Sequence, residues 1–403
     1  HFSSKSIETQ AIHSGRINDE QFGSLATPLY QTSTFIFDDA QQGADRFAGE
    51  SEGFIYTRLG NPTTRQLEMR VAAMEGMEDA AATATGMAAV SAALLTNLQA
   101  GDHLISSKAV YGCSFALMNH MLKKFGIEVT FVDMTKPDNI SAAVKENTKL
   151  IFLETPINPN LVVLDLEKIC AIAKKHQLLS IVDNTFLTPV LQQPAKFGAD
   201  IVIHSITKFI NGTSDTIAGV VCSTKEFIDQ LRDINNGSFM LLGSTMDSLR
   251  SSSVLKNLRT LHIRVKKHSE NAHYLAEMFK KDGVNTVYPG LQEHPSHDLY
   301  QMIINKEYGF GGMLTIDVGT LKKANKLMEK MQKNNIGYLA VSLGFYKTLF
   351  CAPGSSTSSE ISESEQKAMG LSEGLIRFSV GLDNDIKRTY EIIRKCMREL
   401  KII

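Results

Sequence analysis

Polar side chains that could do chemistry follow three of the apolar strands that the sequence predicts. Asp183-Asn184-Thr185 ends one predicted strand, Ser205-Ile206-Thr207-Lys208 ends the next, and Glu154-Thr155-Pro156-Ile157-Asn158 ends an earlier one. Ligands of open α/β sheets bind at the carboxyl ends of the strands, so these side chains are expected along one edge of a sheet. That edge would carry an amine, a carboxylate and two hydroxyl groups.

This combination fits the requirements of pyridoxal 5′-phosphate (PLP). The cofactor needs an amine that condenses with its aldehyde, a carboxylate that keeps its pyridine nitrogen protonated, and donors for its phosphate. Lys208, Asp183, and Ser205 with Thr207 have the side chains for these roles. An opposite charge within about 4 to 6 Å favours the protonated ring nitrogen, which is the form that withdraws electrons from a carbanion.

A second cradle for the phosphate is predicted at Gly86 and Met87, which open a helix after Thr85. The first amides of a helix point outward, and the helix dipole favours an anion at that end. Each candidate alone has an ordinary explanation, because a lysine after a strand is usually solvated and a glycine in an Ala-rich helix usually serves packing. Their joint placement at successive strand ends favours a cofactor site.

The elements that position these residues alternate in type between residues 65 and 225. Short apolar runs alternate with amphipathic segments of helical length, which predicts βαβ units and a mostly parallel, doubly wound α/β sheet. The predicted strands of this sheet are residues 103–107, 128–133, 149–155, 178–184, 200–204 and 216–222.

The remaining chain predicts an arm and a second domain. Residues 1–60 have no clear period and are expected to form an extended arm that wraps a neighbouring subunit. Residues 61–250 would form the large domain, and residues 251–403 a connecting helix and a smaller α+β domain. The long helical connection is expected over residues 245–282, and further strands over residues 312–318, 339–343 and 375–380.

Composition excludes several classes of partner. The chain has 42 Lys plus Arg and 43 Asp plus Glu, so no basic excess predicts binding to nucleic acid. The sequence contains no run of about 18 apolar residues, which a membrane span would require. The polar N-terminus does not resemble a signal peptide. Five scattered cysteines predict neither a disulfide framework nor a zinc site, which favours a reducing cytoplasm. His294-Pro-Ser-His297 indicates an exposed turn more than a metal site.

Ordered motifs over nearly the whole chain resemble the PLP-dependent enzymes of cysteine and methionine metabolism. They are Pro28-Leu-Tyr-Gln-Thr-Ser-Thr-Phe, Tyr56-Thr-Arg58-Leu-Gly-Asn-Pro-Thr, Tyr111-Gly-Cys113, Glu154-Thr-Pro-Ile-Asn158-Pro, Val182-Asp183-Asn-Thr-Phe, Ser205-Ile-Thr-Lys-Phe-Ile-Asn-Gly, Ala340-Val-Ser342-Leu-Gly and Arg377-Phe-Ser-Val-Gly. The resemblance implies fold type I, with a large PLP-binding domain, a small C-terminal domain and an arm that reaches a neighbour's site. It also implies a homotetramer made of two catalytic dimers.

The same resemblance divides the phosphate contacts between two subunits. Tyr56 and Arg58 would bind the phosphate held by the adjacent subunit. The contacts within one chain would come from Gly86, Met87, Ser205 and Thr207.

Further roles implied by the resemblance concern the ring and the substrate. Tyr111 would stack on the pyridine ring and later act as an acid near the leaving group, Asn158 would contact the ring hydroxyl, and Asp183 would contact the ring nitrogen. Arg377, with Ser342 beside it, would bind the substrate carboxylate, because a planar guanidinium offers two parallel hydrogen bonds.

Within the family, the sequence is most similar to the methionine γ-lyases. Cys113 occupies the position after Tyr111-Gly112 where those enzymes carry a cysteine, although a free cysteine also packs as a small apolar residue. Two segments depart from the pattern. Gly212-Thr213-Ser214-Asp215 stands where Gly-His-x-Asp is usual, and Asn236-Gly-Ser-Phe-Met-Leu-Leu-Gly243 replaces a segment with a Lys-Asp pair.

The expected activity is therefore carbon–sulfur lysis of a sulfur amino acid. α,γ-Elimination of L-methionine to methanethiol, 2-oxobutanoate and ammonia is the first expectation, with Lys208, Tyr111 and Cys113 at the reacting atoms. Cystathionine γ- or β-lyase and O-acetylhomoserine sulfhydrylase are the alternatives. An acyl-transfer enzyme with a Ser205-x-x-Lys208 motif is disfavoured, because the serine ends a strand and the partner motifs of that class are missing.

Overall fold

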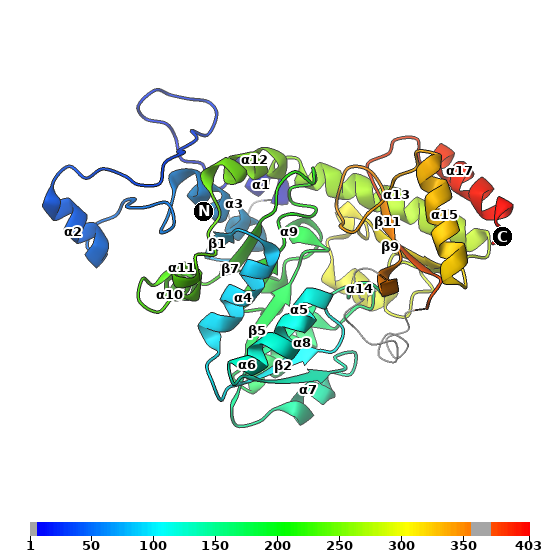
Figure 1. Cartoon of the computed structure of the whole chain (residues 1–403), viewed down its shortest axis with the longest axis horizontal. Coiled ribbons are helices and arrows are strands. Elements are labelled where there is room, and N and C mark those ends of the chain that lie inside the picture. Colours follow the sequence, from blue (N-terminus) through cyan, green and yellow to red (C-terminus); the bar gives the residue numbers. More distant parts are fainter. Residues whose placement is uncertain (1–5, 356–371) are drawn as a thin grey trace.

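Two β-sheets, each with its own apolar core, are linked by the long helix α13 (Figure 1). The computed structural model describes residues 6–355 and 372–403. α13 (Leu261–Lys281) places Leu261 and Val265 in the core of the first sheet and Leu275 and Phe279 in that of the second. One rigid helix therefore connects the two halves of the structure.

The first sheet has the strand order β1-β7-β6-β5-β4-β2-β3. Its strands are β1 (Asp79–Thr83), β2 (His103–Ser107), β3 (Glu128–Val132), β4 (Thr148–Glu154), β5 (Leu179–Asp183), β6 (Ile201–His204) and β7 (Gly219–Ser223). Strands β2 to β6 pair in parallel, and β7 is antiparallel to both β6 and β1. The mostly parallel sheet predicted from the sequence is confirmed, but β1 was not predicted, because its Ala-rich run has little strand propensity and depends on pairing with β7.

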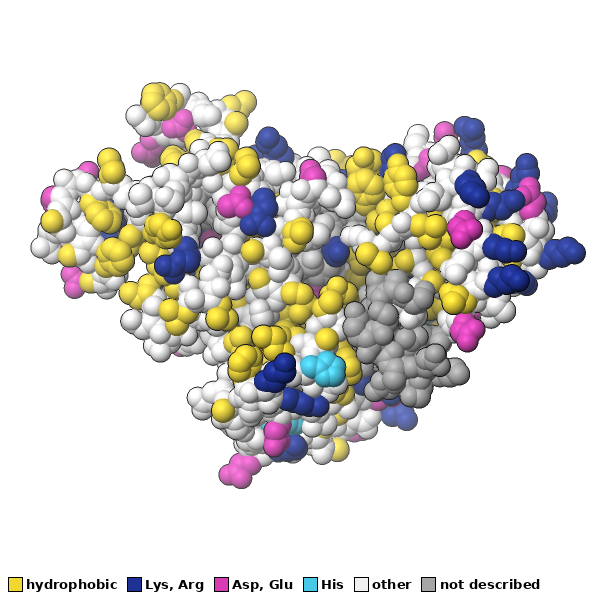
Figure 2. Space-filling model, viewed as in Figure 1, with side chains coloured by type: hydrophobic (Ala, Val, Ile, Leu, Met, Phe, Trp, Pro, Cys, Tyr) yellow, Lys and Arg dark blue, Asp and Glu magenta, His cyan; other side chains and the backbone are white. Residues whose placement is uncertain are grey.

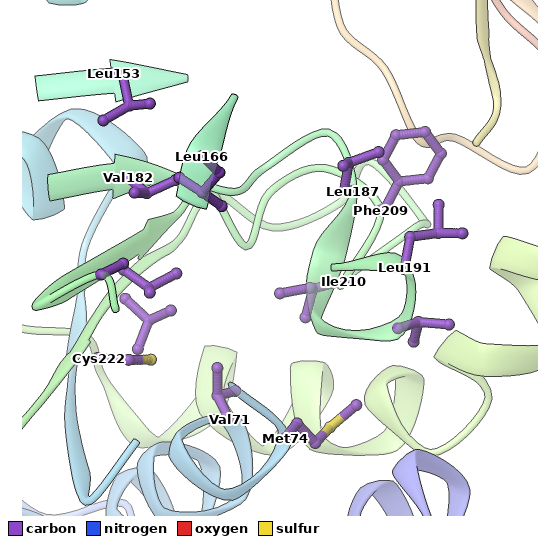
Figure 3. Close-up of a cluster of buried hydrophobic side chains, with 14 of the residues drawn as sticks. Val71, Met74, Leu153, Leu166, Val182, Leu187, Leu191, Phe209, Ile210 and Cys222 are labelled. Carbon is purple, nitrogen blue, oxygen red and sulfur yellow. The ribbon is translucent and has the colours of Figure 1, made fainter. Parts of the chain in front are cut away.

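Helices cover both faces of this sheet, and the side chains of successive strand residues point toward opposite faces. Val182 of β5 joins α3 (Pro62–Glu75), α8 (Leu166–Lys175) and α12 (Ser248–Leu258) in one core (Figure 3). Ile181 joins the other core, which contains α4 (Gly86–Asn97), α5 (Gly112–Ala116), α6 (Leu122–Lys124) and α10 (Lys225–Arg232). This two-sided burial explains the continuous apolar runs of the strands.

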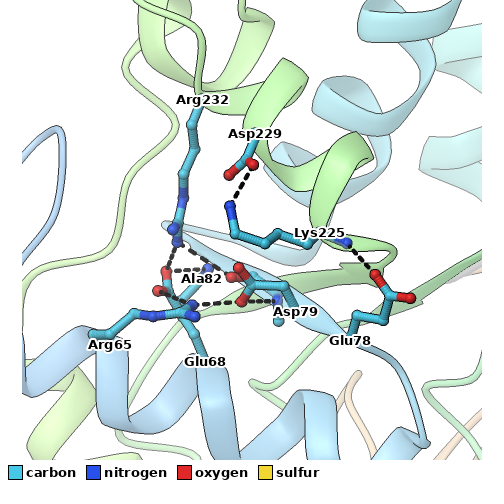
Figure 4. A network of polar contacts seen from close by, with 9 residues as sticks. Arg65, Glu68, Glu78, Asp79, Ala82, Lys225, Asp229 and Arg232 are labelled. Carbon is cyan, nitrogen blue, oxygen red and sulfur yellow. Dashed lines mark hydrogen bonds and ion pairs between the residues drawn. The ribbon is translucent and has the colours of Figure 1, made fainter. Parts of the chain in front are cut away.

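The free edge of β1 is closed by side chains. Glu68 accepts a hydrogen bond from the backbone N–H of Ala82 at 2.9 Å, and Arg232 donates to the carbonyl of Ala80 at 3.2 Å. Arg232 and Arg65 also pair with the Glu68 carboxylate (Figure 4). An edge strand whose backbone groups are occupied does not offer a template for pairing with another chain.

The second sheet has the order β10-β11-β12-β9-β8. Its strands are β8 (Asn285–Val287), β9 (Met313–Asp317), β10 (Tyr338–Leu339), β11 (Leu349–Cys351) and β12 (Leu375–Ser379), packed on α13, α15 (Leu321–Lys333) and α17 (Ile386–Glu399). The strand predicted over residues 339–343 is wrong beyond Leu339. The chain leaves the sheet there, and Ser342 has a φ of 141° that no regular strand contains.

The N-terminal segment and the connection between the sheets also differ in detail from the sequence expectation. α1 (Ile7–His13) packs on α3, whereas α2 (Ala40–Ala48) projects from the body on a long loop (Figure 1). The connection over residues 245–282 is two helices, α12 and α13. The shorter helices are α7 (Asp138–Ala143), α9 (Thr188–Leu191), α11 (Ser238–Leu242) and α14 (His297–Ile303). Among the described residues, no helix combines the length and apolarity that crossing a membrane requires.

Gly344 provides a test of how the second sheet is held against the first. Its φ is 75°, and a Cβ atom there would lie 2.6 Å from the Cα of Phe209, the residue after Lys208. Gly76 has a φ of 74° and nothing within 4 Å of such a Cβ. Gly76→Ala should therefore cost only the backbone strain, about 1 to 2 kcal/mol in the free energy of unfolding.

Gly344→Ala should cost about 1 to 3 kcal/mol more than Gly76→Ala, because overpacking adds to the same strain. Urea unfolding of both variants and the wild type measures the difference. Equal losses in the two variants would contradict the close approach of Gly344 to Phe209.

Candidate active site

A cavity of about 570 Å³ opens at the carboxyl ends of β4, β5 and β6. It is also lined by the start of α4, by α5, and by residues of the second sheet. Eleven of the thirteen predicted site residues line it: Gly86, Met87, Tyr111, Cys113, Asn158, Asp183, Ser205, Thr207, Lys208, Ser342 and Arg377. The strand-end residues among them, such as Asp183, Ser205 and Lys208, meet at one edge of the first sheet as the sequence predicted, whereas Arg377 comes from β12 of the second sheet. The individual roles of all eleven remain predictions.

Asp183 is held in place by a chain of hydrogen bonds. Its Oδ1 accepts from the backbone N–H of Thr185 at 3.0 Å and from the Thr185 hydroxyl at 2.5 Å. The same hydroxyl oxygen accepts from the backbone N–H of Ser205 at 2.8 Å. Burial raises the pKa of Asp183, and the two bonds from Thr185 oppose that rise. A carboxylate in this position could pair with a protonated ring nitrogen.

The start of α4 and the end of β6 approach each other closely. Thr85 caps α4, accepting from the N–H of Ala88 at 2.9 Å, and α4 then presents its first amides at the cavity. A Cβ atom at Gly86 would lie 2.7 Å from the Cβ of Ser205, so only glycine fits. Amides, a hydroxyl and the positive end of a 12-residue helix together suit a phosphate group.

Lys208 extends into the cavity from the turn after β6. Its Nζ lies 3.2 Å from the hydroxyl oxygen of Ser342, to which it donates a hydrogen bond. Burial lowers the pKa of Lys208, and the positive charge of Arg377 lowers it further. A neutral amine is the form that attacks an aldehyde and accepts a proton.

Arg377 is 3% exposed and oriented by two contacts. Its Nη1 donates to Oδ1 of Asn158 at 2.9 Å, and its Nη2 donates to the backbone carbonyl of Ser342 at 3.0 Å. Asn158 thus contacts Arg377 in this structure, a contact that the sequence did not predict. The arrangement fixes the plane of the guanidinium before any carboxylate arrives.

Glu154 is a cavity residue to which the sequence assigned no role. It is 7% exposed, and its carboxyl accepts from the backbone N–H groups of Tyr111 and Asn158. Burial, and next the nearby Asp183, raise the pKa of Glu154 to about 8. The sequence feature that could have identified Glu154 is its place at the end of β4, four residues before the candidate Asn158.

Tyr111 and Cys113 stand together at the start of α5. The Cys113 thiol donates to the Tyr111 hydroxyl oxygen over 3.3 Å, and the nearby Ser114 hydroxyl lies 3.9 Å from the sulfur of Met87. Tyr111 is 38% exposed and Cys113 is partly buried. A phenol and a thiol thus lie within one cavity beside the lysine.

Tyr56 and Arg58 do not join the other candidates. Neither lines the cavity of its own chain. Arg58 donates instead to the carbonyl oxygen of Met240 at 3.1 Å, with the Met240 sulfur at 3.2 Å. Met240 belongs to α11, inside the segment that departs from the family pattern, so this segment contacts Arg58 through a carbonyl and a thioether.

Comparison with known proteins shows the family to which this chain belongs. The model of the Cys/Met metabolism PLP-dependent enzymes matches residues 8–389. The chain belongs to this family. An L-methionine gamma-lyase of Fusobacterium nucleatum subsp. polymorphum is 45% identical over 382 residues, which are 94% of each chain. A cystathionine beta-lyase of Lactococcus lactis subsp. cremoris is 38% identical over 395 residues, 96% of this chain and 99% of that one.

Solved structures agree with this assignment. A putative O-acetylhomoserine (thiol)-lyase from Campylobacter jejuni superposes with a TM-score of 0.91 at 31% identity, covering 98% of this chain and 100% of that one. That structure contains N′-pyridoxyl-lysine-5′-monophosphate. The predicted family, fold type I and PLP as the cofactor are confirmed, and the chain is a PLP-dependent enzyme.

The electrostatic link between Lys208 and Arg377 can be tested through pH. Arg377→Met removes the charge that lowers the pKa of Lys208, so a smaller fraction of the amine is neutral at a given pH. The pH profile for the rate of PLP uptake by the cofactor-free protein should then move to higher pH. Arg377→Lys keeps the charge and should keep the profile. Superimposable profiles for Arg377→Met and the wild type would contradict the link.

Proposed function

We propose that the chain is a carbon–sulfur lyase that carries out α,γ-elimination of L-methionine. The main observation in support of this activity is the hydrogen bond between Cys113 and Tyr111 in the cavity that Lys208 also lines. Several relatives named L-methionine gamma-lyase, 36 to 45% identical over nearly their full length, support the same activity. Cystathionine lyase and O-acetylhomoserine sulfhydrylase are the alternatives within the family.

Substrate binding would begin at Arg377, whose guanidinium is held ready for the α-carboxylate by Asn158 and Ser342. Asp183 would hold the ring nitrogen of the cofactor, and the amides of Gly86 and Met87 with the hydroxyls of Ser205 and Thr207 would hold its phosphate. When bound, PLP supplies an electron sink for negative charge at the substrate α-carbon.

Proton transfer would then fall to Lys208 and Tyr111. Lys208 Nζ, whose lowered pKa favours the neutral amine, would remove the α-proton of a substrate held by Arg377. The same Nζ would shuttle the further protons, taking one from the β-carbon and returning one to the γ-carbon, and Tyr111 would protonate the departing methanethiolate as the bond between the γ-carbon and sulfur breaks. Addition of water releases 2-oxobutanoate and ammonia, which balances the reaction.

The apolar wall of the cavity favours an uncharged leaving group. Ile217 and Val341 line the cavity and are 58% and 60% exposed. The leaving group of cystathionine carries its own amino group and carboxylate. These two charges would need polar partners at this wall. A methylthio group needs only apolar contact, so methionine is the preferred substrate of the proposal.

Substrate profiling tests this proposal directly. Methionine, cystathionine and O-acetylhomoserine with sulfide are assayed side by side for keto acid and thiol. Methionine should give equal amounts of methanethiol and 2-oxobutanoate, and Lys208→Ala should lose this activity together with the visible absorption of the lysine-linked cofactor. A higher kcat/KM for cystathionine would replace methionine as the substrate, and an unchanged spectrum in Lys208→Ala would overturn the role of the lysine.

We also infer a cytoplasmic homotetramer made of two catalytic dimers. Phe22, Leu25 and Ile36 of the N-terminal segment are 81%, 91% and 94% exposed. Hydrophobic side chains are also visible over the projecting α2 region in Figure 2. Such apolar surface favours burial against a neighbouring subunit. Arg58 and Tyr56, which lie outside their own cavity, would then reach the phosphate of the neighbour.

Mixing two inactive variants tests this sharing of sites. Arg58→Ala and Lys208→Ala chains, unfolded and refolded together, should form hybrid dimers with one intact site. Activity should return to about a quarter of the wild-type value, since half of the dimers are hybrid and half of their sites are intact.

The matched control mixes Lys208→Ala with Arg377→Ala. Both of those residues line the cavity of one chain, so no hybrid contains an intact site and no recovery is expected. Equal recovery in the two mixtures, or none in either, would contradict a shared site.

A further inference from the structure

Glu154 occupies a position that other cavity residues depend on. It ends β4 directly opposite Asp183 in the parallel pairing of β4 and β5. Paired residues on neighbouring strands point to the same face and are about 4.8 Å apart. A buried carboxyl group, that of Glu154, and a partly buried one, that of Asp183, therefore lie side by side at the edge of the sheet where the cofactor binds.

The carboxyl of Glu154 connects two separate loops to the sheet. Its Oε2 accepts from the backbone N–H of Tyr111 at 3.2 Å, and its Oε1 accepts from the backbone N–H of Asn158 at 3.0 Å. Asn158 in turn accepts from Arg377. Within residues 6–355 and 372–403, no Lys, Arg or His forms an ion pair with Glu154. Glu154 therefore contacts the backbone of Tyr111 and Asn158, and these contacts hold both residues in position.

We propose that Glu154 is a positioning residue that fixes Tyr111 over the cofactor ring and, through Asn158, fixes Arg377 for the substrate carboxylate. The inference rests on the proposed function, because it concerns the same site. It adds that Tyr111, the proposed acid at the leaving group, and Arg377, which binds the carboxylate, are both held in position by the buried Glu154.

The protonation of Glu154 is consistent with this role. Its pKa of about 8 means that the carboxyl is mostly neutral at pH 7. A neutral acid adds no second negative charge beside Asp183, which can then pair with the ring nitrogen. The other titratable or charged groups that line the cavity are Tyr111, Cys113, Asp183, Lys208 and Arg377.

Glu154→Gln separates positioning from general stability. Glutamine keeps one acceptor oxygen but places an NH₂ group, which cannot accept, against the other backbone N–H. One loop is therefore released. The holoenzyme is titrated with glycine, which has a carboxylate and an amine but no leaving group, and binding is followed by visible absorption and circular dichroism of the cofactor.

Glu154→Gln should bind glycine about tenfold more weakly and should show altered cofactor circular dichroism, because a buried N–H loses its partner. Infrared difference spectra between pH 6 and pH 9 should show a protonated carboxyl in the wild type that Glu154→Gln lacks. Glu68→Gln, which removes a buried carboxyl outside the cavity, is the control and should leave glycine affinity and dichroism unchanged.

Two results would overturn the proposal: glycine affinity and dichroism of Glu154→Gln equal to the wild type, or equal losses in Glu68→Gln. If Glu154→Gln does not fold, Glu154→Asp carries the same test, since it withdraws both acceptors by about 1.5 Å. Wild-type protein without the visible absorption of a lysine-linked cofactor would instead contradict the proposed function. The two failures are thus distinguishable.

Discussion

Three parallel strands, β4, β5 and β6, end at a common edge of the first sheet, and the positions of Glu154, Asp183 and Lys208 depend on their register. Glu154 lies opposite Asp183, and Asp183 lies opposite Ile203. A slip of one residue would turn Asp183 toward the core formed with α3 and would bring Val182 to the cavity. Because helices cover both faces, such a slip would bury an unpaired carboxyl, so the two apolar cores specify the chemistry at the edge.

Burial acts on the charged groups of the cavity in opposite directions. It lowers the pKa of the Lys208 amine and raises the pKa of the carboxyls of Glu154 and Asp183. Each shift favours the neutral form, because a charge leaves water on entering the cavity. The structure offsets this cost at Asp183 with two donors from Thr185, which leaves one carboxyl suited to carry charge and its neighbour suited to carry a proton.

The second sheet completes the site instead of serving as an independent unit. β12 contributes Arg377, and the chain after β10 contributes Ser342 and Gly344. Gly344 packs directly on the backbone that carries Lys208, and its amide donates to the hydroxyl of Ser379 at 2.8 Å. Because α13 belongs to both cores, the distance between lysine and arginine is set by a rigid helix and close backbone packing.

The sequence by itself determined the parallel sheet, the lysine at the end of β6 and the grouping of Asp183, Ser205 and Thr207, because strand periodicity and strand ends are local properties of the chain. It did not predict β1, whose alanines form a strand only by pairing with β7, and it predicted too long a strand at residues 339–343, where Ser342 turns out of the sheet to meet Lys208. The two contacts of Glu154, the pairing of Asn158 with Arg377, and the contact of Arg58 with Met240 were decided only by the tertiary structure. Each of them joins residues that are at least 4 positions apart and mostly more than 40, so no local pattern contains them.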